Sequence, residues 1–449
     1  MNEKIKKISL TNRIYPLEIT SEKIVFATEN INNQDLKEKI EFLFDKEVQF
    51  VNKDENDILK LLKEKYGNIS IGIGQTSLLD SRFFMDKMPT EVVSEILEKA
   101  VFLRASDIHF EPTENLLRTR VRIDGILQPG PDIQIDILPA VLSHIKIISG
   151  LDISEKRRPQ DGKFSFYYNK RKIDVRVSTI PTTYREKIVL RLLDSESLQL
   201  GLNELGFLPG QEQIFSTNIN AKQGIILITG PTGSGKTTTL YSALNYLNDP
   251  GINIVTVEDP VEYELSGLIQ TQVQPKIGYN FANALRAFLR QDPDIIFVGE
   301  IRDRETAEIA IRASLTGHLV FSTLHTNSTM DTISRLMDMG IPSYLISDTI
   351  KMVVAQRLLR RICPACNNGA EKDNCPKCRS TGYYGRIGAF EVLPITAEIQ
   401  TMIKENCSKK EFKSIIKKQK LMAFAESIEH YIKKGLTSEE EVQRVFFQE

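Results

Sequence analysis

The sequence lacks several features that would assign it to other classes of protein. Its 449 residues include 58 basic and 59 acidic side chains, so the net charge is −1 and indicates no broad nucleic-acid-binding or membrane-binding surface. No apolar run approaches the roughly 18 residues of a membrane span. The charged residues 1–10 do not begin a signal peptide, and no internal repeat is visible. We therefore expect a cytoplasmic globular chain of roughly two to four domains.

Cysteine is also scarce, and four of the five cysteines form two close pairs. In a cytoplasmic chain this spacing predicts a metal site rather than disulfides. Four thiolates would hold tetrahedral Zn²⁺ and leave no open position, which indicates a structural zinc. The gap of eight residues between the pairs requires a tight hairpin. A reactive dithiol pair or an unoccupied site is the alternative. The predicted ligands are Cys363, Cys366, Cys375 and Cys378, while Cys407 lies outside the pairs.

The strongest positive feature is a phosphate-binding loop. A strand-like apolar run over residues 224–229 precedes it, and a helix-like run over residues 238–247 follows it. The glycines allow backbone N–H groups to face phosphates. Lys236 would reach the β- and γ-phosphates, and the Thr237 hydroxyl would hold Mg²⁺. We therefore predict a nucleotide site formed by Gly230, Pro231, Thr232, Gly233, Ser234, Gly235, Lys236, Thr237 and Thr238.

Two further apolar runs end in acidic residues. Glu258 and Asp259 follow one run, and Gly299 and Glu300 follow another. Open α/β sheets place their active groups at the carboxyl ends of strands. Nucleoside triphosphatases usually carry the Mg²⁺-holding acid at the position of Gly299. We therefore expect Glu300 either to act on Mg²⁺ through water or to polarise the attacking water. Ordinary acids at strand ends are the alternative.

Histidine and arginine supply the remaining candidates. His318 and His325, two of only five histidines, bracket a third apolar run and are candidates to contact the γ-phosphate. Arg176 and Arg191 belong to strand-like segments nearer the N-terminus. An arginine on one domain can act as a finger at a nucleotide held by another domain. Structural histidines and a solvated arginine face are the alternatives.

Composition and apolar periodicity predict several domains along the chain. Residues 1–67 predict a small α/β domain, and residues 68–88 a linker. Residues 89–197 mix helices with strands, which predicts an α+β domain. A hinge over residues 198–209 leads to residues 210–449, where alternating strands and helices predict a parallel α/β sheet.

These motifs together resemble the ATPases of type II secretion and type IV pilus assembly. The resemblance covers about residues 90–395 and is weak for residues 1–67, which look like a reduced form of that family's N-terminal docking domain. Beside the phosphate-binding loop, the acids and the cysteines, it rests on Ala105–Pro112, Arg122–Gly125, Val257–Pro260, Gly299–Arg302, Gly317–Asn327 and Gly382–Glu391.

The resemblance implies a homohexameric ring of subunits with a RecA-like P-loop core and a PAS-like α+β domain. It implies ATP as the substrate, with Mg²⁺ and Zn²⁺ bound, a zinc insertion at residues 360–382 and further helices at the C-terminus. The residues that it assigns are Glu300 as the catalytic acid, Glu258 in an acidic box, His318 and His325 in a histidine box, and Arg176 and Arg191 as arginines that approach the phosphates.

The implied function is a cytoplasmic motor at the inner face of the inner membrane, which drives polymerisation of pilins or pseudopilins. Its implied partners are an inner-membrane platform protein and a cytoplasmic docking protein, with peripheral membrane association and no direct nucleic-acid contact. Pilus retraction and conjugative-type secretion are alternative motors, which the tetracysteine site and the N-terminal extension disfavour. A nucleotide-binding regulator with a zinc ribbon is the non-enzyme alternative. The cargo (secreted protein, pilus or DNA uptake) stays open.

Overall fold

The structure is a computed structural model that describes residues 87–193, 200–368, 375–405 and 423–447, several single residues between these ranges, and parts of residues 5–61. Residues 68–86 of the predicted linker and residues 198–199 of the predicted hinge lie outside the described residues. The chain divides into two units, Met1–Asp80 and Ser81–Glu449. None of the described helices combines the length and apolarity that crossing a lipid bilayer demands.

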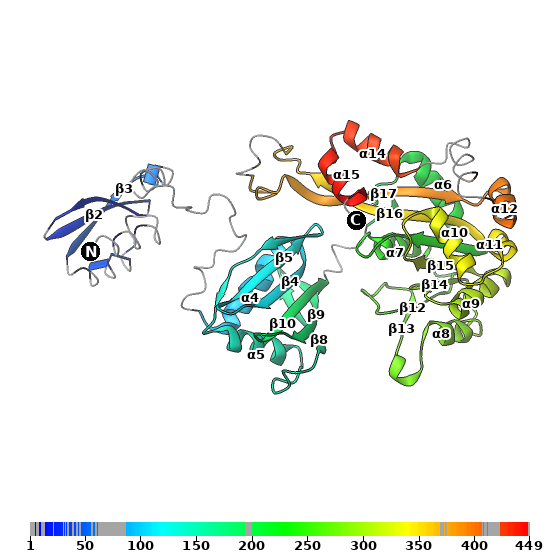
Figure 1. Cartoon of the computed structure of the whole chain (residues 1–449), viewed down its shortest axis with the longest axis horizontal. Helices are drawn as coiled ribbons and strands as arrows, with labels where there is room; N and C mark the ends of the chain where they lie inside the picture. Colours follow the sequence, from blue (N-terminus) through cyan, green and yellow to red (C-terminus); the bar gives the residue numbers. More distant parts are fainter. Residues whose placement is uncertain are drawn as a thin grey trace. The chain divides into compact units, whose positions relative to one another are not determined.

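The first unit contains a three-stranded sheet, which Figure 1 draws in blue. Its strands are β1 (Tyr15–Ile19), β2 (Lys23–Thr28) and β3 (Glu47–Asn52), with β2 antiparallel to β1 and parallel to β3. The parallel pair needs a crossover segment between its strands. Between β2 and β3, the described residues 36, 37, 40 and 41 are helical. This unit therefore has the mixed α/β character that the sequence predicts.

Residues 87–193 form an antiparallel sheet of order β6-β5-β4-β10-β9-β8, with β7 paired to β5. Two helices, α4 (Pro89–Phe102) and α5 (Leu138–Ile148), contribute buried apolar side chains. Over residues 172–178 of β9, buried apolar residues alternate with exposed or half-buried polar ones, as a sheet with one covered face requires. The strands are β4 (Ala105–Pro112), β5 (Leu116–Ile123), β6 (Ile126–Pro129), β7 (Ile133–Gln134), β8 (Gln160–Tyr168), β9 (Arg171–Pro181) and β10 (Glu186–Leu193).

A third sheet lies within residues 224–394, in the order β13-β12-β14-β15-β11-β16-β17. All its neighbouring strands are parallel except β16 and β17, which form a long antiparallel hairpin (Figure 1). The predicted parallel sheet is confirmed, and the hairpin is an addition to it. The strands are β11 (Gly224–Thr229), β12 (Ile254–Glu258), β13 (Ile269–Gln272), β14 (Ile295–Val298), β15 (Leu319–Leu324), β16 (Ile350–Ile362) and β17 (Tyr383–Pro394).

Both faces of this sheet are buried, which explains the continuous apolar runs in its sequence. In β11, Ile225 and Leu227 join one apolar core, while Ile226 and Ile228 join another. The first core includes side chains of α8 (Phe281–Phe288), α9 (Arg304–Leu315), α10 (Thr329–Asp338), α11 (Ser343–Thr349) and α12 (Ala397–Lys404); the second includes those of α6 (Pro209–Ile219) and α7 (Lys236–Leu247). Near the C-terminus, α14 (Phe424–Lys433) and α15 (Glu439–Phe446) share a smaller cluster with β16 and β17.

Candidate active site

The phosphate-binding loop connects the end of β11 to the start of α7. Gly230, Gly233 and Gly235 have φ of +146°, +79° and +88°, a region that side-chain-bearing residues rarely adopt. A Cβ atom at Gly230 would lie 2.4 Å from the carbonyl oxygen of Gln356, so the loop also needs a glycine there for space. Around Gly233, by contrast, nothing among the described residues lies within 4 Å of such an atom. The loop is therefore open on the side of Gly233.

Two polar groups of the loop face inward, and no described residue forms an ion pair with either. The Lys236 ammonium donates to the carbonyl oxygens of Gly230 (2.8 Å) and Pro231 (3.1 Å). The Ser234 hydroxyl is buried and has no hydrogen-bond partner in the part of the chain that the structure describes. Buried polar groups normally have partners, and phosphate oxygens would satisfy both. At the start of α7 the N-terminal dipole favours the same anion, so the loop fits a nucleotide's phosphates.

The pKa of Lys236 is lowered to about 8, chiefly because the ammonium is buried. The carboxylate of Glu300 opposes this shift, and Arg357 adds to it. Bound phosphate would raise this pKa again, because an anion favours the charged lysine. Below about pH 8 the Lys236 side chain is already protonated in the free protein, whereas above about pH 8 it has to take up a proton when phosphate binds.

We therefore expect the affinity for Mg²⁺-ATP to fall above about pH 8, approaching about tenfold per pH unit. A titration with a fluorescent ATP analogue between about pH 7 and about pH 9.5 measures this. The arginine in Lys236→Arg keeps its charge throughout this range. If this variant binds ATP, its affinity should therefore stay constant above about pH 8. A wild-type affinity that stays constant up to about pH 9.5 would contradict the lowered pKa.

The carboxylate of Glu300 lies directly after β14 and contacts two basic side chains. One oxygen accepts a hydrogen bond from Arg302 (2.5 Å), and the other lies 3.4 Å from Nε2 of His325. Arg302 also approaches Asp259 at 3.6 Å. Burial is the main cause that lowers the pKa of His325, and Lys236 adds to it while Glu300 opposes it. The structure thus brings Glu300, His325 and Lys236 to one edge of the sheet.

The position of Gly299 explains why the acid comes one residue later than usual. A Cβ atom there would lie 3.3 Å from the Val257 carbonyl oxygen and 3.4 Å from Cα of Glu258 and from the Phe281 ring. The Gly299 N–H also donates to that carbonyl oxygen at 2.8 Å. A side chain at this point would therefore be in tight contact with β12 and α8, which would have to shift by a few tenths of an ångström. Glu300 is therefore the first acid after the strand that can extend into the site.

Hydroxyl groups fix the strand ends that carry the site. The Thr326 N–H donates to the Thr229 hydroxyl (2.9 Å), which joins the end of β11 to the segment after β15. The Thr323 hydroxyl donates to the Gly299 carbonyl oxygen (2.7 Å), which joins β15 to the segment after β14. Because β15 lies between β11 and β14, these bonds hold the phosphate-binding loop, His325 and Glu300 in a fixed relation.

The structure separates the two predicted histidines. His318 precedes β15 and His325 follows it, so they lie at opposite ends of a six-residue strand, roughly 20 Å apart. Nδ1 of His318 lies 2.8 Å from the Ala313 carbonyl oxygen and 3.2 Å from the Thr316 hydroxyl, near the end of α9. His318 therefore does not reach the phosphate-binding edge of this chain, and only His325 does.

Glu258 lies beside the site but is buried in a polar cluster of its own. Its carboxylate accepts hydrogen bonds from the Tyr241 hydroxyl, the Thr256 hydroxyl (2.6 Å) and the Gln270 amide (3.2 Å). The side chain is buried, which raises the pKa of Glu258 although the three hydrogen bonds oppose that shift. The carboxylate is fully engaged within the protein.

The two predicted arginines are neighbours on adjacent strands, Arg176 on β9 and Arg191 on β10. Arg176 contacts the segment that follows β12, where it donates to Glu262 (2.9 Å) and to the carbonyl oxygen of Val261. Arg191 donates to Asp107 on its own sheet at 3.1 Å. Arg176 therefore already joins the smaller sheet to the acidic segment, whereas Arg191 is held by its own sheet.

Two polar residues of β16 lie beside the site but are not among those predicted from the sequence. The Gln356 amide oxygen accepts from the Thr239 hydroxyl on α7 (2.9 Å), and Arg357 donates to the Asn327 amide oxygen (3.1 Å). Both side chains are buried. The sequence does carry a signal for these two residues. A glutamine and an arginine stand next to each other within a mostly apolar run from Ile350 to Leu359, and such residues are rarely buried without a specific partner.

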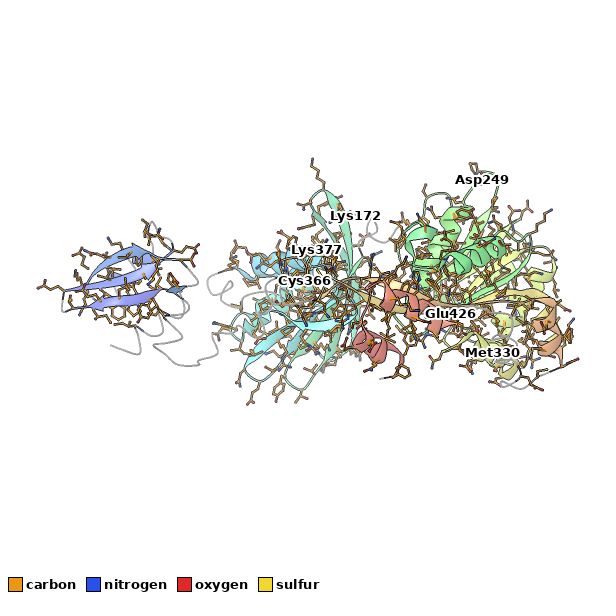
Figure 2. All side chains as sticks on the ribbon, turned by 90° about the horizontal axis from the view of Figure 1, so that it is seen from above. Lys172, Asp249, Met330, Cys366, Lys377 and Glu426 are labelled. Carbon is orange, nitrogen blue, oxygen red and sulfur yellow. The ribbon has the colours of Figure 1, made fainter. Side chains whose placement is uncertain are left out.

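The four paired cysteines meet at the end of the β16–β17 hairpin, where Figure 2 labels Cys366 and Lys377 beside each other. Their sulfur atoms lie within 4.8 Å of one another, and no disulfide joins them. Two of the Sγ–Sγ distances are 3.8 Å and 3.6 Å, close to the roughly 3.8 Å that tetrahedral Zn–S bonds of about 2.3 Å require. The two residues after each pair adopt positive φ, in Asn367, Asn368, Arg379 and Ser380. The site fits a structural Zn²⁺.

Replacing both Cys363 and Cys375 by serine should remove bound zinc and lower the midpoint of thermal unfolding by about 5 °C or more, as expected from losing about 2 kcal/mol in a domain of this size. Metal analysis of the purified chain and a thermal melt measure both effects. Cys407→Ser, outside the cluster, should keep both values. Zinc content that survives the double substitution would contradict this ligand set.

Comparison with known proteins places this geometry in a family. A family model described as "Type II/IV secretion system protein" matches residues 85–444. The chain belongs to this family. The match includes both larger sheets, the phosphate-binding loop and the cysteine hairpin. It confirms the family that the sequence motifs resemble.

Curated relatives agree with this membership. The type IV pilus assembly ATPase PilB of Acinetobacter baylyi is 39% identical over 482 aligned positions, which cover 98% of this chain and 83% of that protein. The type II secretion system protein E of Dickeya dadantii is 45% identical and covers 79% of this chain and 75% of its own length. This secretion-ATPase family thus accounts for nearly all of the sequence.

Solved structures give the same fold. The pilus retraction motor PilT, solved with bound ADP, is 30% identical with a TM-score of 0.56 and covers 78% of this chain and 95% of its own. The ATPase DotB of Legionella pneumophila is 23% identical with a TM-score of 0.60, covering 80% of this chain and 95% of its own. The parallel sheet with its phosphate-binding loop is therefore the RecA-like core predicted from the sequence.

Proposed function

We propose that this protein is an ATPase motor that drives polymerisation of pilins or pseudopilins in type II secretion or type IV pilus assembly. The observation that supports this most is the convergence of Lys236, Glu300 and His325 at one sheet edge in a chain of the secretion-ATPase family. A lysine that binds phosphates beside an acid that orients water is the arrangement that ATP hydrolysis requires.

In the proposed mechanism the loop from Gly230 to Thr238 would bind the phosphates of ATP, and the Thr237 hydroxyl would hold Mg²⁺. When bound, Mg²⁺ neutralises charge on the β- and γ-phosphates. Glu300 orients the attacking water with one carboxylate oxygen, while its second carboxylate oxygen accepts a hydrogen bond from Arg302 (2.5 Å). His325 has a lowered pKa and is neutral at pH 7, so its imidazole can donate to Glu300 or to a phosphate without adding charge.

Two contacts support a role for the smaller sheet in this cycle. Arg176 holds Glu262 and Val261, next to the acidic segment. Asp124 accepts from the Gly385 N–H (2.9 Å), near the end of the hairpin that carries the cysteines. We propose that Arg176 and Arg191 complete the site when bound nucleotide draws the smaller sheet against the core, and that hydrolysis releases them. Glu258 supports this closure from its buried position.

The assembly that we propose is a homohexameric ring with one site per subunit. It would act in the cytoplasm at the inner face of the inner membrane, through a membrane platform protein and a cytoplasmic docking protein. The four cysteines would hold Zn²⁺ as a structural ion.

Pilus retraction is the second candidate, and the similarity to PilT is the observation that favours it. Two observations favour assembly instead. The PilB relative aligns with 98% of this chain, whereas the PilT structure covers 78%. The identity to the assembly and secretion relatives is also higher, at 39% and 45% against 30%. Assembly of the filament is therefore the function that we propose.

Steady-state phosphate release by the purified full chain, with ATP and Mg²⁺, tests the enzymatic part. A motor should turn over continuously, whereas a nucleotide-binding regulator should bind ATP without sustained release. Turnover no faster than that of a chain with Lys236→Ala would contradict the proposal.

A further inference from the structure

A cluster of polar groups around Glu258 lies buried beside the helix that follows the phosphate-binding loop. Its centre is the hydroxyl group of Tyr241, a side chain that is 1% exposed. This hydroxyl donates to Glu258 and accepts from the backbone N–H of Glu262 (3.3 Å) and, at a longer 3.4 Å, from the Gln270 amide. The same amide donates to Glu258 and to the carbonyl oxygen of Tyr263 (3.2 Å each).

The position of Tyr241 on α7 connects this cluster to the nucleotide site. Tyr241 lies four residues after Thr237, so both side chains lie on the same face of the helix, one turn apart. Its ring also packs edge-on against Tyr263, with ring centres 4.7 Å apart. Through Tyr241, the helix that begins at the phosphate-binding loop is therefore in direct contact with the segment between residues 258 and 263.

That same segment receives the arginine of the smaller sheet. Arg176 donates to the Glu262 carboxylate and to the Val261 carbonyl oxygen. The Glu262 backbone N–H donates to the Tyr241 hydroxyl. Residue 262 is thus held by Tyr241 through its backbone and by Arg176 through its side chain, so the two contacts meet at a single residue.

We infer that Tyr241 is a positioning residue, whose hydroxyl holds residues 258–263 against the phosphate-binding helix so that Arg176 and the first turn of α7 move together. This role rests on the proposed ATPase function and extends it. Tyr241 touches no reacting atom, and it acts through Glu258 and Glu262. Tyr246 serves as the matched control, because it lies on the same helix but its side chain is 58% exposed.

The test is a set of kinetic measurements on the full chain with Tyr241→Phe, which keeps the ring and removes the hydroxyl. We expect kcat to fall about tenfold while KM for ATP changes by less than about threefold, because binding groups are intact and only closure is impaired. Tyr246→Phe should leave both constants unchanged. Thr256→Val, which removes a different donor to Glu258, should lower thermal stability and leave kcat within about twofold.

Coupling to Arg176 distinguishes positioning from stability. Arg176→Ala should lower kcat about tenfold in the wild-type chain and by less than about twofold in the Tyr241→Phe chain, because the two residues act as one unit. Full multiplication of the two effects, an unchanged kcat in Tyr241→Phe, or a Tyr241→Phe chain that fails to fold would each overturn the inference. Absence of turnover in the wild-type chain would instead reject the ATPase proposal.

Discussion

Replacing Lys236 by alanine should weaken nucleotide binding severely and abolish ATP turnover. The ammonium is buried at the start of α7 and, within the described part of the chain, is bonded to two loop carbonyl oxygens, so bound phosphates would be its strongest partners. Removing a charged group from such a site costs about 3 kcal/mol or more, which weakens binding by about 100-fold or more. Turnover should fall to the background of the assay because the same group stabilises the transferred phosphate.

Titration with a fluorescent ATP analogue and a phosphate-release assay measure these two effects. Lys222→Ala is the matched control, since Lys222 is an exposed lysine shortly before β11. The control should keep wild-type binding and turnover. If Lys236→Ala retained wild-type affinity, the loop between Gly230 and Thr238 would not be the nucleotide site.

Replacing Glu300 by glutamine should separate binding from hydrolysis. The amide has the same size and can still accept from Arg302, so the structure should persist. Without the carboxylate the attacking water is no longer oriented, and kcat should fall by about 100-fold to about 1,000-fold. Affinity for ATP should stay within about threefold of wild type, since Lys236 and the loop are unchanged.

Single-turnover hydrolysis measured beside ATP binding gives both values. Glu308→Gln on α9 is the control, because Glu308 pairs with the exposed Arg304 and lies outside the site. A Glu300→Gln chain that hydrolysed ATP at the wild-type rate would move the catalytic role to another acid.

Local sequence motifs predicted the parts of the site that depend on a short stretch of chain. The phosphate-binding loop, Glu300 and the four cysteines each depend on a few consecutive residues and a fixed spacing. The fold class followed in the same way from the long apolar runs of the parallel sheet, because both of its faces are buried. The strand β8 is harder to recognise in the sequence, because its half-buried positions alternate with exposed ones but its aromatic residues occupy both kinds of position, including the exposed Tyr167.

Contacts between distant segments could not be predicted. The sequence shows Glu258 as an acid at a strand end. Beside the neighbouring Thr256, its carboxylate is bonded by Tyr241, 17 residues earlier, and by Gln270, 12 residues later. The partners of Gln356 and Arg357 depend likewise on which strands become neighbours. The separation of His318 from His325 was predictable, because residues that bracket one strand lie at its opposite ends.

The central claim is that ATP hydrolysis at Glu300 drives filament assembly, and one measurement tests it most directly. In a strain of the source organism that lacks its own copy of this protein, assembled pilin or pseudopilin filaments are counted after expression of the wild-type chain or of Glu300→Gln. We predict that the wild type restores filaments and that Glu300→Gln, although it binds ATP and is present at the same level, restores none. Filaments restored equally by both chains would contradict the account.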